Sequence, residues 1–248
     1  MTRTQSVRSA LIFVCDHASN TLPAEYGSLG LPPEAFERHI AYDIGAADVA
    51  RALGTRFAAP AILGPHSRLL VDLNRGPDDP TLVMRLSDRS IIPGNARVDA
   101  TEIVKRMRLY YQPYHDRIEA EIARASATGA APVLISVHSF TPEWRGWKRP
   151  WHIGILWSEK DPRLARFLLA RLAQETDLTV GDNEPYSGEL EGDCMDQHAV
   201  SRGFAHVLIE LRQDLVDTKE KAEKWAARLA PVLQDGLNLL DLKPLARS

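Results

Sequence analysis

Short apolar runs alternate with longer amphipathic stretches along most of this chain, and this alternation limits its fold more than any other feature. The runs are four or five residues long and rich in bulky side chains, as expected of buried strands. They occupy residues 11–15, 60–63, 69–73, 133–137, 153–157 and 206–209. Strands that alternate with helices predict a largely parallel sheet covered on both faces. We therefore expect an α/β fold, a three-layer α/β/α sandwich with a mostly parallel or mixed central sheet.

The stretches between these runs carry apolar residues at three- and four-residue spacing, which is the period of an α-helix. One predicted helix covers residues 34–57. On that helix His39 and Asp43 would lie one turn apart and face the same side. Further helices are predicted over residues 99–122, 161–172 and 217–240.

Composition predicts a soluble globular protein and argues against nucleic acid and membranes as partners. Its 248 residues suit a single domain, residues 1–248, and the net charge of −3 offers no basic field for nucleic acid. Residues 1–9 lack the apolar segment of a signal peptide, and no run of about 18 apolar residues could span a membrane. Cys15 and Cys194 are too few for a disulfide framework. These features predict a cytoplasmic location with no membrane partner, and they leave a homo-oligomer open.

Polar and ionisable residues terminate four of the predicted strands. In open parallel sheets, ligands bind outside the carboxyl ends of the strands, so these residues are the first candidates for chemistry. Because a buried imidazole or carboxylate needs a partner, their convergence suggests a functional site. The residues are Asp16, His17 and Asn20 after the first run, Asp72, Asn74 and Arg75 near the third, His138 and Ser139 after the fourth, and Glu210, Arg212 and Asp214 after the last.

Two histidines and several carboxylates on separate strand ends suit a hydrolytic zinc site. Such sites use three His or carboxylate ligands and leave one position for water. A carboxylate outside the ligand set then carries the proton to the leaving nitrogen, and Glu210 is our candidate for that role. Simpler interpretations stay open at this point. His17 and His138 would then be hydrogen-bonded structural residues, and Glu210 with Arg212 would be a buried ion pair.

At these positions the chain resembles the N-formylglutamate amidohydrolase family. The matching stretches appear in a consistent order, and each is weak alone. They are residues 14–20, 39–46, 71–75, 92–95, 113–115, 136–140, 183–188 and 209–214. The resemblance implies a fold similar to that of the zinc carboxypeptidases and aspartoacylase, a phosphorylase/hydrolase-like α/β/α sandwich.

The resemblance also implies residue roles. His17 and His138 would bind one Zn²⁺ ion, and Glu210 would be the general acid/base. Asn74 and Arg75 look like the Asn-Arg pair that holds a substrate carboxylate, a task that suits the bidentate guanidinium.

The third metal ligand is not fixed by the resemblance. The wider superfamily places a glutamate three residues after the first histidine, where this chain has Asn20, and a neutral amide is a poor zinc ligand. Asp43 is the better candidate because it lies in a stretch shared with the family and, on the predicted helix, beside His39. Asp16 is a further alternative, either as a ligand or as a residue that orients an imidazole.

The remaining candidates lie around this set. Arg212, Asn95 and Tyr186 are assigned to substrate binding, and His39 and His115 to positions behind the metal ligands. The expected substrate is a small-molecule N-acyl amino acid, with N-formyl-L-glutamate implied by the family. Cleavage of another N-acyl amino acid or of a small peptide amide remains an alternative, as does a non-catalytic binding protein on the same fold.

Overall fold

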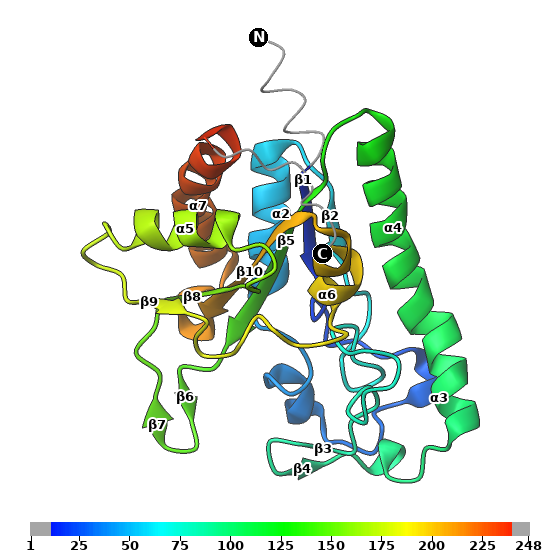
Figure 1. The fold of residues 1–248 in the computed structure, drawn as a ribbon. Coiled ribbons are helices and arrows are strands. Elements are labelled where there is room, and N and C mark those ends of the chain that lie inside the picture. Colours follow the sequence, from blue (N-terminus) through cyan, green and yellow to red (C-terminus); the bar gives the residue numbers. More distant parts are fainter. Residues whose placement is uncertain (1–10, 240–248) are drawn as a thin grey trace.

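In the computed structural model, which describes residues 11–239, a six-stranded mixed sheet forms the centre of the molecule (Figure 1). The first four strands in spatial order are mutually parallel, whereas the last two run the opposite way. Their order is β2 (Ala61–Leu63), β1 (Leu11–Cys15), β5 (Val133–Phe140), β10 (Ala205–Arg212), β8 (Ile153–Leu156) and β9 (Val180–Asp182). The predicted α/β sandwich with a mostly parallel or mixed sheet is confirmed.

Helices cover both faces of this sheet. One layer contains α2 (Ala46–Phe57), α5 (Arg163–Leu172) and α7 (Lys219–Leu239), and the other contains α4 (Gln112–Ala127) and α6 (Cys194–His198). Figure 1 places α2, α5 and α7 together on one side of the sheet and α4 on the other. Because successive strand side chains point to opposite faces, Phe13 packs with the first layer and Val14 with the second. Burial on both faces explains why the strand sequences are continuously apolar.

Shorter elements connect these layers. Two hairpins and a helical segment project beyond the carboxyl ends of the parallel strands. They are β3–β4 (Leu86–Ser87 and Ser90–Ile91), β6–β7 (Glu143–Trp144 and Trp147–Lys148) and α3 (Ala100–Arg106), which continues through the π-turn η4 (Met107–Tyr111) into α4. The 3₁₀ turns are η1 (Ala24–Tyr26), η2 (Pro33–Glu37), η3 (Pro93–Asn95), η5 (Val200–Arg202) and η6 (Gln213–Leu215).

None of the helices within residues 11–239 combines the length and apolar character needed to cross a bilayer. The signal-peptide expectation concerns residues 1–9, which lie outside the described residues, as does the end of the predicted last helix at residue 240.

The single helix predicted over residues 34–57 is wrong in its first half. A 3₁₀ turn ends at Glu37, and α2 begins only at Ala46. Gly45 separates the two with a φ of +79°, which a right-handed helix does not allow. A β-carbon there would also meet the carbonyl oxygen of Val216 at 2.0 Å. His39 and Asp43 therefore lie in an irregular loop and not one helical turn apart.

Strand limits also differ from those predicted. Residues 69–73 form turns and irregular backbone instead of a strand. By contrast, β5 and β10 each extend three residues beyond their predicted ends, so that His138 and Glu210 lie inside strands. The two residues are direct neighbours in the parallel ladder. Backbone pairing continues through these polar positions because it does not depend on an apolar side chain.

Candidate active site

A pocket of about 460 Å³ opens at the carboxyl ends of the parallel strands. This is where ligands bind in open α/β sheets. His17 follows the end of β1, while His138 and Glu210 come from adjacent positions of β5 and β10. All three line the pocket, and all are at least nine-tenths buried. The sheet thus brings together three residues that are far apart in the sequence.

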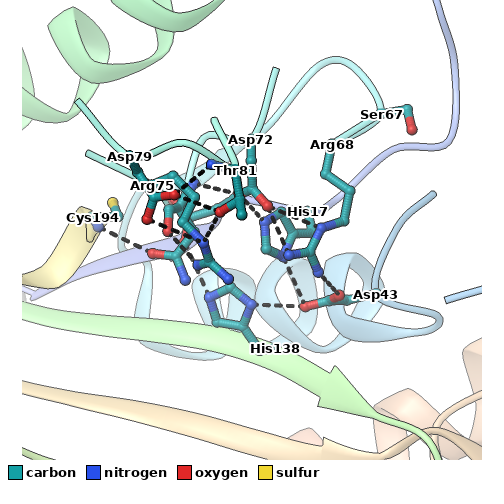
Figure 2. Close-up of polar contacts among 12 residues, drawn as sticks. His17, Asp43, Ser67, Arg68, Asp72, Arg75, Asp79, Thr81, His138 and Cys194 are labelled. Atoms are coloured by element: carbon teal, nitrogen blue, oxygen red, sulfur yellow. Dashed lines mark hydrogen bonds and ion pairs between the residues drawn. The ribbon is translucent and has the colours of Figure 1, made fainter. Parts of the chain in front are cut away.

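Two imidazoles converge on one carboxylate at the base of this pocket. The Nδ1 atom of His138 lies 2.7 Å from Oδ2 of Asp43, and the Nδ1 atom of His17 lies 3.3 Å from the same oxygen. In Figure 2, dashed lines lead from both rings to this carboxylate. The backbone N–H of Asp43 donates to the carbonyl of His17 (2.9 Å), which ties the loop carrying Asp43 to the end of β1.

The opposite nitrogen of each ring meets a different carboxylate. His17 Nε2 lies 2.7 Å from Oδ1 of Asp72, and His138 Nε2 lies 3.1 Å from Oδ2 of Asp16. Histidines that bind metals usually donate their second N–H to a carboxylate in this way, which fixes the tautomer and the ring orientation. Asp16 is therefore placed to orient His138 and not beside Asp43 as a ligand. Asp72 has the same relation to His17.

Other side chains fix these two orienting carboxylates. Arg68 donates to Oδ2 of Asp72 through Nε and Nη2, at 3.1 and 2.7 Å. The phenol of Tyr114 donates to Oδ1 of Asp16 at 2.9 Å. Each carboxylate is at most 1% exposed. The orientation of both imidazoles is thus set by a hydrogen-bonded frame that water does not reach.

The cluster carries an excess of negative charge. Its carboxylates are Asp16, Asp43 and Asp72, and its guanidinium is that of Arg68. When both imidazoles are neutral, these four groups leave two negative charges uncompensated. Buried charge of one sign is costly, and a divalent cation would balance it.

Protonation of the imidazoles relieves the same imbalance in the metal-free protein. Burial and Arg68 lower the pKa of His17, but Asp72 and Asp43 outweigh them and the net shift is upward. Burial also lowers the pKa of His138, yet its hydrogen bonds to Asp16 and Asp43 raise this pKa well above its usual range. A metal ion would take the place of these protons, so binding should release them.

The side chains present at the pocket base fit a zinc ion. One ligand atom from each of His17, Asp43 and His138 lies within 4.8 Å of the others. Two histidines and one carboxylate form a zinc ligand set that leaves a position free. Asn20 is not among the residues that line the pocket, and its amide Nδ2 donates to the carbonyl of Phe36 at 3.0 Å.

Glu210 lies in the same pocket but outside the ligand set. Its side chain is 6% exposed, and its Oε2 atom is buried without a hydrogen-bond partner in residues 11–239. Burial, with a further contribution from Asp43, raises the pKa of this carboxyl to about 7. A carboxyl with a pKa near neutrality exchanges protons readily at physiological pH, which is the requirement for a general acid/base. Arg212 is not its partner, since that guanidinium pairs with Asp214 at 2.8 Å.

The substrate-binding candidates divide into two groups. Asn74, Arg75 and Tyr186 line the pocket. The guanidinium of Arg75 donates to Thr81 Oγ1 (3.2 Å), which lies beside it in Figure 2. It also donates to the carbonyl of Asn74 (2.8 Å). Arg212 and Asn95 are not among the residues that line the pocket. Their assignment to substrate binding is corrected, because Arg212 is held by Asp214 and the amide of Asn95 is fully used inside the protein.

Asn95 is a structural residue, and its replacement should affect stability alone. Its Nδ2 donates to the carbonyls of Leu69 (2.8 Å) and Met84 (2.9 Å), and its Oδ1 accepts from Arg106 (2.7 Å), all with no exposed surface. Each buried group left unsatisfied costs about 1–3 kcal/mol. We expect Asn95→Ala to lower the free energy of unfolding by roughly 3 kcal/mol in denaturant titrations. A raised KM at unchanged stability would restore its substrate-binding role.

The two histidines expected behind the metal ligands lie elsewhere. His39 lines the pocket, and its Nε2 lies 3.4 Å from Oδ2 of Asp88. His115 is buried on α4, where its Nδ1 lies 2.7 Å from Nε2 of His198. Neither histidine contacts His17 or His138 through a hydrogen bond in the described part of the chain.

Two members of the site were missed as functional candidates. Asp72 was noted at a strand end but given no role, and Arg68 was not considered. Both belong to residues 68–72, which contain a conspicuous pair of opposite charges four residues apart. Opposite charges four residues apart could have indicated an ion pair between Arg68 and Asp72. The segment was predicted to be a strand, however, and in a strand residues four apart do not form a close pair.

Fold and pocket together define an α/β sandwich protein whose pocket contains two histidines and a carboxylate that could hold a metal ion. Residues 9–216 match the family model of N-formylglutamate amidohydrolase, and the chain belongs to that family. The family resemblance noted in the sequence is thereby confirmed.

Solved structures include close relatives of this fold. The gene product Atu2144 from Agrobacterium tumefaciens is 37% identical, with a TM-score of 0.88 over 92% of this chain and 90% of the other. An N-formylglutamate amidohydrolase from Ralstonia eutropha JMP134 is 18% identical, with a TM-score of 0.67 over 92% of this chain and 94% of the other, and supports the fold alone. No curated protein matches the sequence.

Proposed function

We propose that this protein is a zinc-dependent amidohydrolase that cleaves N-formyl-L-glutamate to formate and glutamate. The observation that carries the proposal is the convergence of His17, Asp43 and His138 beside the buried carboxyl of Glu210, in a member of the N-formylglutamate amidohydrolase family. The three converging side chains would hold one zinc ion. When bound, zinc supplies a Lewis acid that polarises the scissile carbonyl and lowers the pKa of water.

Glu210 would handle the protons of the reaction. Its carboxylate takes a proton from the water molecule whose oxygen attacks the formyl carbon. The carbon–nitrogen bond then breaks, and Glu210 delivers the proton to the leaving amine nitrogen. A pKa of about 7 suits both halves of this cycle, because the group must accept a proton and then lose it again.

The pocket walls would bind an anionic substrate. Both Arg68 and Arg75 line the pocket, and N-formyl-L-glutamate carries two carboxylates. Arg68 is committed to Asp72 by two hydrogen bonds. Arg75 forms hydrogen bonds to neutral oxygens of Thr81 and Asn74, and its ion pair with the partly exposed carboxylate of Asp79 is longer, at 3.8 Å. Arg75 is therefore the better anchor for a substrate carboxylate. Its planar guanidinium can bind such a group through two hydrogen bonds.

Metal analysis paired with a turnover assay tests the proposal. We expect the purified protein to contain zinc, to hydrolyse N-formyl-L-glutamate, to lose activity in a chelator and to regain it with added zinc. N-acetyl-L-glutamate and N-formyl-L-leucine serve as comparison substrates, because they change the acyl group and the side chain separately. Zinc dependence with preference for another substrate would overturn the named substrate and keep the reaction class. Tight binding without turnover would indicate a binding protein.

A further inference from the structure

A second cluster of ligand-type side chains lies between α4 and α6, apart from the residues that line the pocket. Cys194 and His198 are four residues apart on α6 and share one face, which is opposed by His115 from α4. One ligand atom from each lies within 4.8 Å of the other two. Their exposed fractions are 0%, 3% and 4%. A cysteine and two histidines gathered in a water-free space are an unusual content for a hydrophobic core.

The hydrogen bonds around these side chains leave the imidazole lone pair of His198 directed at His115. His198 Nδ1 donates to Oε1 of Glu119 (2.6 Å), and Arg202 Nη2 donates to the same oxygen (2.6 Å). The other ring nitrogen of His198, Nε2, therefore carries the lone pair and lies 2.7 Å from Nδ1 of His115. A carboxylate behind an imidazole, anchored in turn by a cation, is the usual support of a metal-binding histidine.

His115 has a polar atom that this network does not satisfy. Because His198 Nε2 is an acceptor, Nδ1 of His115 must be the donor between them, which leaves a lone pair on Nε2 of His115. That atom is buried, and no group in residues 11–239 donates to it. A buried acceptor without a partner costs about 1–3 kcal/mol, so hydrogen bonding alone does not account for this arrangement.

We propose that His115, Cys194 and His198 form a second metal site that binds a zinc-type divalent cation. Imidazole nitrogen and thiolate sulfur are the ligands that zinc prefers, whereas calcium and magnesium require oxygen ligands. Burial and the nearby carboxylate of Asp16 raise the pKa of the Cys194 thiol, and metal binding releases its proton. The positive ion offsets the repulsion between the resulting thiolate and that carboxylate.

The position of the site assigns it a structural role. Asp193, directly before α6, lines the active-site pocket, and the backbone N–H of Cys194 donates to Oδ1 of Asn74 at 3.0 Å. A cation that joins α6 to α4 would fix this segment against the pocket wall. The site is separate from the ligand set of His17, Asp43 and His138, which contains no sulfur.

Cobalt substitution distinguishes the two sites, because only this second site offers sulfur. We expect the full-length protein loaded with Co²⁺ to bind two equivalents per chain and to show a near-ultraviolet sulfur-to-cobalt charge-transfer band. Cys194→Ser should lose the band and one equivalent. Cys15→Ala, which replaces the other buried cysteine, should keep the charge-transfer band and both cobalt equivalents. Zn²⁺ added to the cobalt protein should displace the ion and remove the band.

Two results would overturn the proposal: a fully loaded wild-type protein without the band, or a band that persists in Cys194→Ser. The first needs no variant, so it decides even if Cys194→Ser does not fold. His198→Gln provides a second variant, because it removes an imidazole ligand and leaves the thiol in place, and it should also lower the stoichiometry by one. None of these readouts depends on hydrolase activity, so the second site and the proposed reaction can fail independently.

Discussion

Replacement of His138 by alanine should remove the zinc ion held at the pocket, one equivalent per chain, and abolish turnover of N-formyl-L-glutamate. The ring contributes one of the three converging ligand atoms, and its Nε2 is held by the buried carboxylate of Asp16. The Lewis-acid contribution of a catalytic metal amounts to several kcal/mol, which corresponds to a rate loss of roughly 10³-fold or more. Metal analysis after dialysis, together with kcat/KM for the same preparation, measures both effects.

His39→Ala is the matched control for this variant. His39 also lines the pocket, but it pairs with Asp88 at the mouth and stands outside the ligand set. It should therefore keep its zinc. Wild-type turnover in His138→Ala would refute the proposed site, and so would a zinc content of His138→Ala equal to that of the wild type.

Glu210→Gln should leave the zinc content unchanged and lower kcat/KM by about 10²- to 10⁴-fold, the usual contribution of a general acid/base. Glutamine has nearly the same shape as glutamate but cannot carry a proton between water and the leaving amine. Glu189→Gln is the control, because Glu189 lies at the exposed edge of the same pocket. Equal losses in both variants would indicate an effect of pocket charge and not of proton transfer.

The pH profile of the same variant gives an independent test. The carboxyl of Glu210 must be ionised to accept a proton, so kcat/KM should rise with pH through its pKa. Burial sets this pKa at about 7 in the metal-free protein. A neighbouring cation favours the carboxylate, so the acidic limb of the zinc enzyme should lie below pH 7. This limb should be absent in Glu210→Gln, and its persistence there would assign it to another group.

The sequence predicted the general class of the fold and several residues of the pocket. Bulky apolar runs that alternate with helical periods can bury their surface in few ways, so the α/β sandwich followed from pattern alone. The rule that ligands bind beyond the carboxyl ends of parallel strands selected His17, His138 and Glu210, and all three line one pocket. Local sequence patterns were sufficient to select these three residues, because the end of each strand can be predicted from neighbouring positions.

Local sequence patterns did not predict the contacts between segments that are far apart in the chain. The loop before α2 carries Asp43 to the two imidazoles because its backbone bonds to His17, and not through the helix that the periodicity suggested. Asp72 and Arg68 lie in irregular backbone, where no period reveals which way a side chain points. The same limit explains Asn95, which the sequence assigned to substrate binding and which the structure shows bonded to three buried partners.

By itself, then, the sequence determined the family, the layered fold and the strand-end residues that line the pocket, because hydrophobic periodicity and short motifs are written in neighbouring positions. Only the tertiary structure decided which carboxylate faces both imidazoles, which carboxylates orient them from behind, and which polar residues are occupied elsewhere. The physical reason is that hydrogen bonds and charges act over about 3–4 Å in space, whatever the separation along the chain.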